Sequence, residues 1–147
     1  MELLNVNFNN SENSWFQKKF NQLENKISTI FTDDYVFKKK YLFEQRAQES
    51  SRILNKYPNR VPIIVEKLDN APNIDKRKYL VPLDFTMGQF LYVIRKRIKM
   101  ESYEALYIYI NNNLVPTANL ISNIYNENKD KDGFLYVNYG VENTFGA

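Results

Sequence analysis

The 147-residue chain contains no cysteine and no histidine. The first absence excludes disulfides, a thiolate nucleophile and a cysteine metal site within the chain. The second removes the commonest general base and the commonest zinc ligand. Paired carboxylates or an activated lysine remain as catalytic groups, but we expect a protein that is not an enzyme and holds no metal or cofactor. Any thioester chemistry would have to use the cysteine of a partner.

Long apolar runs and a strong net charge are also lacking. The run from Leu106 to Ile110 is far shorter than the roughly 20 residues that cross a bilayer. The opening residues, MELLNVNFNN, lack the basic start and apolar stretch of a secretory signal. A net charge of +3, from 20 basic and 17 acidic residues, is too small to indicate nucleic-acid binding. We therefore expect a cytoplasmic protein with no nucleic-acid partner.

Helical periodicity appears in several segments of the chain. Residues 1–13 look disordered, and a capping box from Ser14 to Gln17 opens a predicted amphipathic helix over 15–30. A second helical region is predicted over 35–57, a third over 86–99 behind the Thr86–Gln89 capping box, and a short one from Thr117 to residue 125. The expected buried stripe of the second region is Phe43, Ala47, Ile53, Leu54 and Tyr57, and that of the third is Phe90, Val93, Ile94 and Ile98.

Alternating apolar residues predict four strands, over 60–67, 78–83, 105–110 and 134–139. Pro62 lies inside the first strand, so at least one of its edges should be unpaired there. Turns are expected at 111–113 and 130–133, and a tail over 140–147. Two strands, a crossing helix and two more strands predict an α+β fold, a ubiquitin-like β-grasp roll with a mixed sheet and two additional N-terminal helices.

Several long motifs occur in this order along the chain. They are FEQRAQES (43–50), NRVPIIVEK (59–67), IDKRKYLVP (74–82), GQFLYVIRKRI (88–98) and YNENKDKDGFLYVNYGVENTFG (125–146). Together they resemble the ubiquitin-like autophagy modifiers, the family that includes GABARAP. The resemblance divides the chain into an N-terminal extension, 1–36, and a modifier domain with a C-terminal conjugation tail, 37–147. Two departures are a short loop over 68–73 and Leu42 in place of a common proline, which predicts a softer break between the two leading helices.

The tail carries one of only four glycines, Gly146, next to the final residue Ala147. A polar tail with a chance glycine would be unremarkable by itself. The resemblance implies that a processing protease, which reads Thr144 and Phe145, removes Ala147. An activating and a conjugating enzyme would then attach Gly146 to phosphatidylethanolamine. Two acyl chains suffice for stable anchoring, so a lipid-anchored pool on autophagosomal membranes is expected beside the cytoplasmic one.

Alternation over residues 78–81 places Lys78 and Leu80 on one side of the strand and Tyr79 and Val81 on the other. Such residues can simply be strand core, but the charge of Lys78 and the ending at Pro82 favour an open edge. The resemblance implies that this edge binds receptors with an aromatic-x-x-aliphatic motif as an added strand.

The resemblance assigns side chains to each part of that groove. The aromatic pocket is Glu49, Ile53, Pro62, Ile64, Lys78, Leu80 and Phe134. The aliphatic pocket is Tyr79, Val81, Pro82, Phe85, Phe90 and Val93, where Phe85 replaces the usual leucine. Acidic residues that flank the motif would meet Arg60, Lys76 and Lys78. A further surface over 107–109 is a minor candidate for helical partners.

Other patterns have plain structural interpretations. Asn128, Asp130, Asp132 and Gly133 resemble the start of a calcium loop, but Tyr139 stands where the bidentate glutamate belongs, so we interpret them as a turn. The basic residues 95–97 favour a helix end, and 38–40 a solvated face.

For the whole chain, the alternative is a non-conjugated interaction module in vesicle trafficking or at another organelle. The extension is interpreted as an appendage, although Phe20 and Leu23 have the spacing of a receptor motif.

Overall fold

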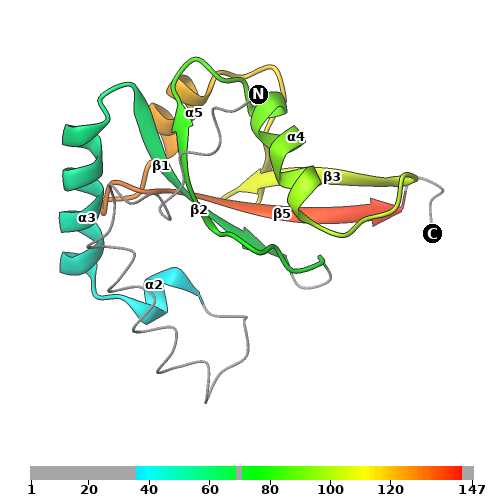
Figure 1. Ribbon diagram of the computed structural model, residues 1–147, viewed down its shortest axis with the longest axis horizontal. Coiled ribbons are helices and arrows are strands. Elements are labelled where there is room, and N and C mark those ends of the chain that lie inside the picture. The colour runs from blue at the N-terminus through cyan, green and yellow to red at the C-terminus, as the bar shows by residue number, and fades with distance from the viewer. Residues whose placement is uncertain (1–35, 69–70, 144–147) are drawn as a thin grey trace.

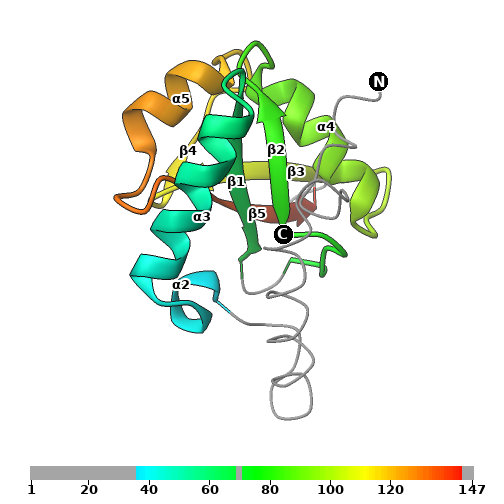
Figure 2. The ribbon, with the colours of Figure 1, turned by 60° about the vertical axis from the view of Figure 1, so that its left-hand side comes forward.

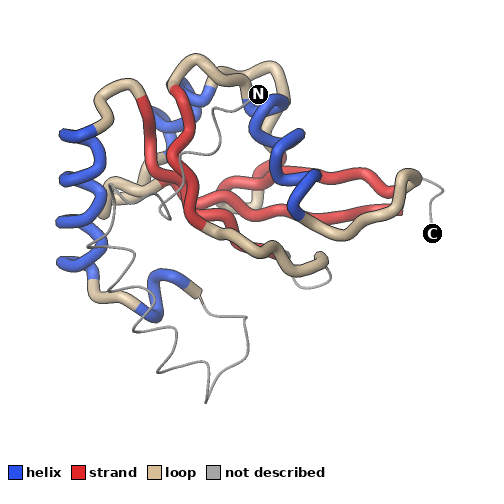
Figure 3. Tube along the Cα trace, viewed as in Figure 1, coloured by secondary structure: helices blue, strands red, loops and turns tan. Residues whose placement is uncertain are grey.

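The computed structural model describes residues 36–68 and 71–143 of the chain. The helix predicted over 15–30 and the tail residues 144–147 lie outside the described residues. The elements are α2 (Phe37–Lys40), α3 (Phe43–Lys56), β1 (Arg60–Lys67), β2 (Lys78–Pro82), α4 (Met87–Arg97), β3 (Glu104–Ile110), β4 (Asn113–Leu114), α5 (Ile121–Asn128) and β5 (Leu135–Asn143). Figure 1 and Figure 3 show α3 and α4 on opposite sides of β1 and β2.

The sheet is mixed, as predicted, with the strand order β2-β1-β5-β3-β4. β1 runs parallel to β5, and the other neighbouring strands are antiparallel. β5 continues beyond the predicted end at residue 139, because Glu104 to Leu106 of β3 pair with Val141 to Asn143. The predicted tail therefore starts too early. The two-residue β4 was not predicted; it follows a turn in which Asn111 and Asn112 have φ values of 51° and 65°.

β2 lies at the edge of the sheet, and its neighbour β1 contains the predicted break in pairing. Pro62 is opposite Leu80 of β2, whereas pairing of β1 with β5 begins only at Ile63. The proline, which has no N–H to donate, therefore occupies the place where the β5 side of the strand is still unpaired. This confirms the inference from its position in the sequence.

The second helical region is two separate helices. Tyr41 and Leu42 adopt extended conformations, with ψ values of 140° and 150°, so the break is complete without a proline. The predicted buried stripe of α3 is wrong at its start, since Phe43 is 47% exposed. Of that stripe only Ile53 is fully buried, while Ala47, Leu54 and Tyr57 are half-buried. The other buried residues of α3 are Arg46, Glu49 and Ser50.

α4 begins as predicted and α5 does not. Thr86 and Gln89 bond reciprocally at the start of α4. The predicted cap Thr117 lies four residues before α5, whose N-cap is Leu120 without a side-chain bond. Thr117 instead accepts a 2.9 Å hydrogen bond from the Gly88 amide, and a Cβ on Gly88 would lie 3.3 Å from the same carbonyl oxygen. Bonds between distant segments, not a local cap, thus fix this turn.

Two apolar clusters lie on the two sides of the sheet. Figure 2 shows the helices that cover them, with α3 beside β1 and α4 beside β2. The main core includes Ile63 and Val65 of β1, Tyr79 and Val81 of β2, and side chains of α4 and α5. The small cluster consists of Phe37, Tyr41, Ile53, Ile64, Leu80 and Phe134. Alternation along β1 and β2 therefore sends successive side chains into different clusters.

Candidate functional site

The residues predicted for the aromatic pocket gather on the α3 side of the sheet. Four of the seven belong to the small cluster: Ile53, Ile64, Leu80 and Phe134. Pro62 and Glu49 are also buried, and Glu49 forms an ion pair with Arg52 one turn along α3. Lys78 is only 7% exposed, so this face is more closed than the alternation argument suggested.

The residues predicted for the aliphatic pocket lie on the other side of β2. Tyr79, Val81, Phe85 and Phe90 are all buried members of the main core, and Val93 packs against them partly exposed. The Tyr79 and Phe90 rings meet edge to face with centroids 5.5 Å apart. Pro82 is buried at the end of the strand. The same side chains therefore also serve as strand core.

The three predicted cations divide between the two ends of β2. Arg60 is opposite Pro82 at the end of the strand, whereas Lys78 is opposite Ile64 at its start. Lys76 lies two residues before Lys78 and is half-buried. The two ends, Lys78 and Pro82, are four residue steps apart along the strand, which is about 13 Å. The structure therefore brings Lys76 and Lys78 together and places Arg60 apart from them.

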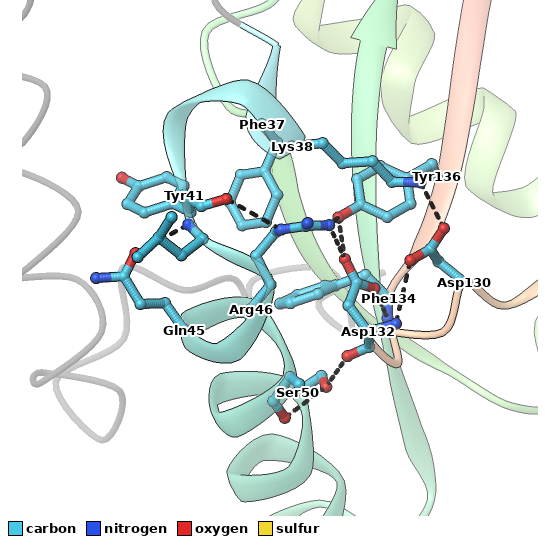
Figure 4. Close-up of polar contacts among 12 residues, drawn as sticks. Phe37, Lys38, Tyr41, Gln45, Arg46, Ser50, Asp130, Asp132, Phe134 and Tyr136 are labelled. Atoms are coloured by element: carbon cyan, nitrogen blue, oxygen red, sulfur yellow. Dashed lines mark hydrogen bonds and ion pairs between the residues drawn. The ribbon is translucent and has the colours of Figure 1, made fainter.

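A buried polar network that the sequence did not reveal joins α3 to the turn before β5. Arg46 donates to the Asp132 carboxylate at 2.6 Å, and the exposed fractions of the two side chains are 10% and 0%. The Tyr136 hydroxyl donates to the same carboxylate at 2.5 Å, and the Phe134 amide donates to its other oxygen at 2.8 Å (Figure 4). Ser50 donates to the Asp132 carbonyl oxygen. The sequence does contain one sign of this network. Arg46, Glu49 and Ser50 have the helical spacing that places them on one face of α3 together with the apolar Ile53.

The network also accounts for the residues that resembled a calcium loop. Both carboxylate oxygens of Asp132 accept hydrogen bonds, and Asp130 pairs with Lys38 and accepts from the Asp132 amide. Burial raises the pKa of Tyr136, and the hydrogen bond to Asp132 adds to this effect. Burial alone would raise the pKa of Asp130, but Lys38 and the Asp132 amide lower it overall. These carboxylates therefore hold a turn together.

The basic end of α4 contacts neighbouring loops. Arg95 donates to the carbonyl oxygens of Glu101 and Glu104, which lie beyond the helix. Arg97 lies 3.5 Å from Asp75 and above the Tyr79 ring.

Of the residues 107–109, the minor candidate surface for helical partners, Ile108 is in the main core, while the tyrosines on either side are half-buried. No helix within the described residues is long and apolar enough to cross a membrane.

Comparisons with known proteins identify the family of this fold. A family profile described as "Autophagy protein Atg8 ubiquitin like" matches residues 45–146, more than half of the chain. The chain belongs to the Atg8 family. Autophagy-related protein 8c of Arabidopsis thaliana is 56% identical over 112 residues, which are 75% of this chain and 94% of that protein. Autophagy-related protein 8 of Saccharomyces cerevisiae is 58% identical over 112 residues, 75% of this chain and 96% of that protein.

Solved Atg8 structures share the fold. The crystal structure of Trypanosoma brucei ATG8 has a TM-score of 0.70 at 40% identity, covering 78% of this chain and all of that one. Plasmodium falciparum Atg8 in complex with a P. falciparum Atg3 peptide has a TM-score of 0.66 at 32% identity, covering 72% and 95%. The ubiquitin-like α+β fold and the autophagy family predicted from the sequence are thus confirmed. The family profile begins at residue 45, so the extension 1–36 lies outside it.

Proposed function

We propose that this Atg8-family chain is a precursor whose Ala147 is removed so that Gly146 can be joined to phosphatidylethanolamine. The observation that supports this most strongly is that the match to the family profile runs through the tail as far as Gly146. A glycine suits the role because the absent side chain allows its carboxyl group to enter a narrow active site. Phe145 and Thr144 would be read by the processing protease.

The catalysts are supplied by partners in this proposal. The chain has no cysteine or histidine, so the thioesters form on the cysteines of an activating and a conjugating enzyme, and the chain itself is a substrate. The structural relative from P. falciparum was solved with an Atg3 peptide, which supports an Atg3-type conjugating enzyme as a partner here. The conjugate is a lipid-anchored pool on autophagosomal membranes beside a cytoplasmic one.

The edge position of β2 supports the proposal of a receptor groove. A receptor segment adds as a strand to the outer side of β2 and places an aromatic side chain towards the small cluster and an aliphatic one towards the main core. Lys76 and Lys78 meet acidic residues at one end of the motif and Arg60 at the other. Ion pairs that stay open to solvent, such as those of Lys76 and Arg60, contribute about 0–1 kcal/mol each, so the two pockets provide most of the affinity.

The conjugation proposal is tested by comparing the native chain with Gly146→Ala in cells. We expect a lipid-modified form of the native chain by mass spectrometry and its flotation with membranes, and loss of both in the variant. The matched control is Gly140→Ala, the same change within β5. Its added Cβ meets only the Leu68 Cδ1 at 3.3 Å and the Tyr109 ring at 3.5 Å.

Two further results sharpen this test. A chain without Ala147 should be conjugated even where the processing protease is absent. If Gly146→Ala reaches membranes as well as the native chain does, conjugation is not what places it there, and the chain acts as a non-conjugated interaction module.

A further inference from the structure

The small cluster contains two residues that the predicted aromatic pocket does not include. Phe37 lies on α2 and Tyr41 directly follows it, and both pack with Ile53, Ile64, Leu80 and Phe134, the four pocket residues of the cluster. No side chain of the six is more than 6% exposed. Phe37 and Tyr41 therefore form a wall of the same cluster, contributed by a different helix.

The aromatic rings of this cluster contact one another directly. The Phe37 ring meets the Phe134 ring edge to face, with centroids 5.3 Å apart and planes at 68°. It also lies 5.0 Å from the Tyr41 ring and 6.2 Å from the Tyr136 ring. Protein interiors are close-packed, so a change in the size of one ring shifts its neighbours. The volume of Phe37 thus limits how far Phe134 can move away from a guest ring.

Long-range contacts hold α2 in place, since a helix of four residues is not stable alone. The Phe37 amide donates to the Glu66 carboxylate at 2.9 Å. Lys38 pairs with Asp130 and lies 4.6 Å above the Tyr136 ring. Arg46 donates to the Tyr41 carbonyl oxygen at 3.2 Å while it bonds to Asp132, whose other oxygen holds the Phe134 amide (Figure 4). One polar network therefore fixes both Phe134 and the helix behind it.

We propose that Phe37 is a positioning residue that sets the size of the aromatic pocket and so selects the ring that a receptor motif presents. It acts from behind the pocket, through Phe134, and does not touch the receptor. This inference rests on the proposed receptor groove and deepens it, because it assigns ring selectivity to α2. A smaller side chain at this position lets Phe134 retreat and favours the largest guest ring, that of tryptophan.

The test uses two labelled peptides that are identical except for the aromatic residue, acidic-acidic-Trp-x-x-Leu and acidic-acidic-Phe-x-x-Leu. Their dissociation constants are measured by fluorescence polarisation for the full native chain, Phe37→Leu, and the matched control Phe43→Leu. Phe43 is six residues away and 47% exposed, so its change to leucine is chemically the same but outside the cluster. For Phe37→Leu we expect the preference for tryptophan over phenylalanine to rise about five- to tenfold. For Phe43→Leu it should stay within about twofold.

Each other outcome has a defined meaning. An unchanged preference, which includes equal weakening of both peptides by Phe37→Leu, or a reduced preference for tryptophan would overturn the role of Phe37 while leaving the groove proposal intact. A native chain that binds neither peptide would overturn the groove proposal itself. Thermal unfolding checks that the variants are folded. If Phe37→Leu does not fold, it is replaced by Phe37→Met, whose side chain has nearly the same volume as leucine but is unbranched and fills irregular space more easily. The ratio must rise for this variant too.

Discussion

The two sides of the sheet are built from different kinds of residue. The main core, between the sheet and α4 and α5, consists of buried hydrophobic side chains. The α3 side holds the small cluster and, among the described residues, every buried polar or charged side chain. These are Arg46, Glu49, Ser50, Lys78 and Asp132.

This difference indicates a division of structural roles between the two sides. Burying apolar surface stabilises the fold without directional demands. A buried ion pair is weak support for stability, because well-packed hydrophobic residues often serve equally well. The charged side is therefore explained better by the positions that it fixes, those of Phe134, Tyr41 and α2, than by the stability that it adds.

The largest loss of stability is expected on the apolar side. Ile94 of α4 is fully buried in the main core. Ile94→Ala removes apolar contacts and leaves a cavity, so the free energy of unfolding should fall by about 2–5 kcal/mol. Urea unfolding, followed by far-UV circular dichroism, measures this change in the free energy of unfolding. A loss below about 1 kcal/mol would show that the main core is not the chief source of stability.

The charged side should be sensitive in a different way. Arg46→Met leaves Asp132 without its cation, and breaking a buried pair in this manner costs about 3 kcal/mol. The tyrosine and amide donors of Asp132 remain, which limits the damage to the turn. Hydrogen exchange should show increased opening of residues 132–136 and of α2 before the main core is affected. Uniform loss of protection across both sides would contradict the division.

Much of the fold follows from local sequence, and most of the charged network does not. The capping box at Thr86 and Gln89 and the alternation of β1 depend on neighbouring residues, so they could be predicted. Arg46 and Asp132 lie 86 residues apart, and nothing local indicates that they meet. The prediction of Thr117 as a helix cap was wrong for the same reason, since a hydrogen bond from the distant Gly88 amide fixes that turn.

The candidate site was predicted mainly through the resemblance to a known family. Alternation correctly assigned Leu80 and Tyr79 to opposite sides of β2. It did not show that both are fully buried, because burial depends on α3 and α4, which pack against β2 from elsewhere in the chain. Phe37 was missed because its helix is only four residues long and has no periodicity of its own.

Alkaline pH should weaken the apolar side by a smaller and graded amount. Burial raises the pKa of Tyr139 to about 12, and burial also raises the pKa of Tyr79. Unfolded tyrosine loses its proton near pH 10, so the stabilisation is complete below pH 10 and declines as the pH rises towards 12. Each such tyrosine contributes a slope of about 1.4 kcal/mol per pH unit. Unfolding titrations of native chain and Tyr139→Phe should differ by that slope; equal slopes would refute the assignment.

The smallest effect is expected at the surface of the charged side. Lys38 is 44% exposed where it pairs with Asp130. Lys38→Met should therefore lower the free energy of unfolding by less than about 1 kcal/mol, and less in high salt. The lowered pKa of Asp130 should return towards its ordinary value in the variant, which carboxyl NMR titration can follow. The pair of Lys38 with ionised Asp130 stabilises the fold at pH values above the pKa that the Asp130 carboxyl has in the unfolded chain. This stabilisation is lost as the pH falls through the lower pKa of Asp130 in the folded chain.

Two neighbouring isoleucines of β1 allow the most direct test of the division between the two sides. Ile63 is buried in the main core and Ile64 in the small cluster, 0% and 1% exposed. Their changes to alanine are chemically identical, and both should destabilise the fold. Binding of the acidic-acidic-Trp-x-x-Leu peptide is measured well below each variant's Tm. We predict about tenfold weaker binding for Ile64→Ala, in the cluster of the aromatic pocket, and a smaller change, about threefold or less, for Ile63→Ala, which lies opposite Tyr79 of the aliphatic pocket. Equal weakening by the two variants would contradict the account.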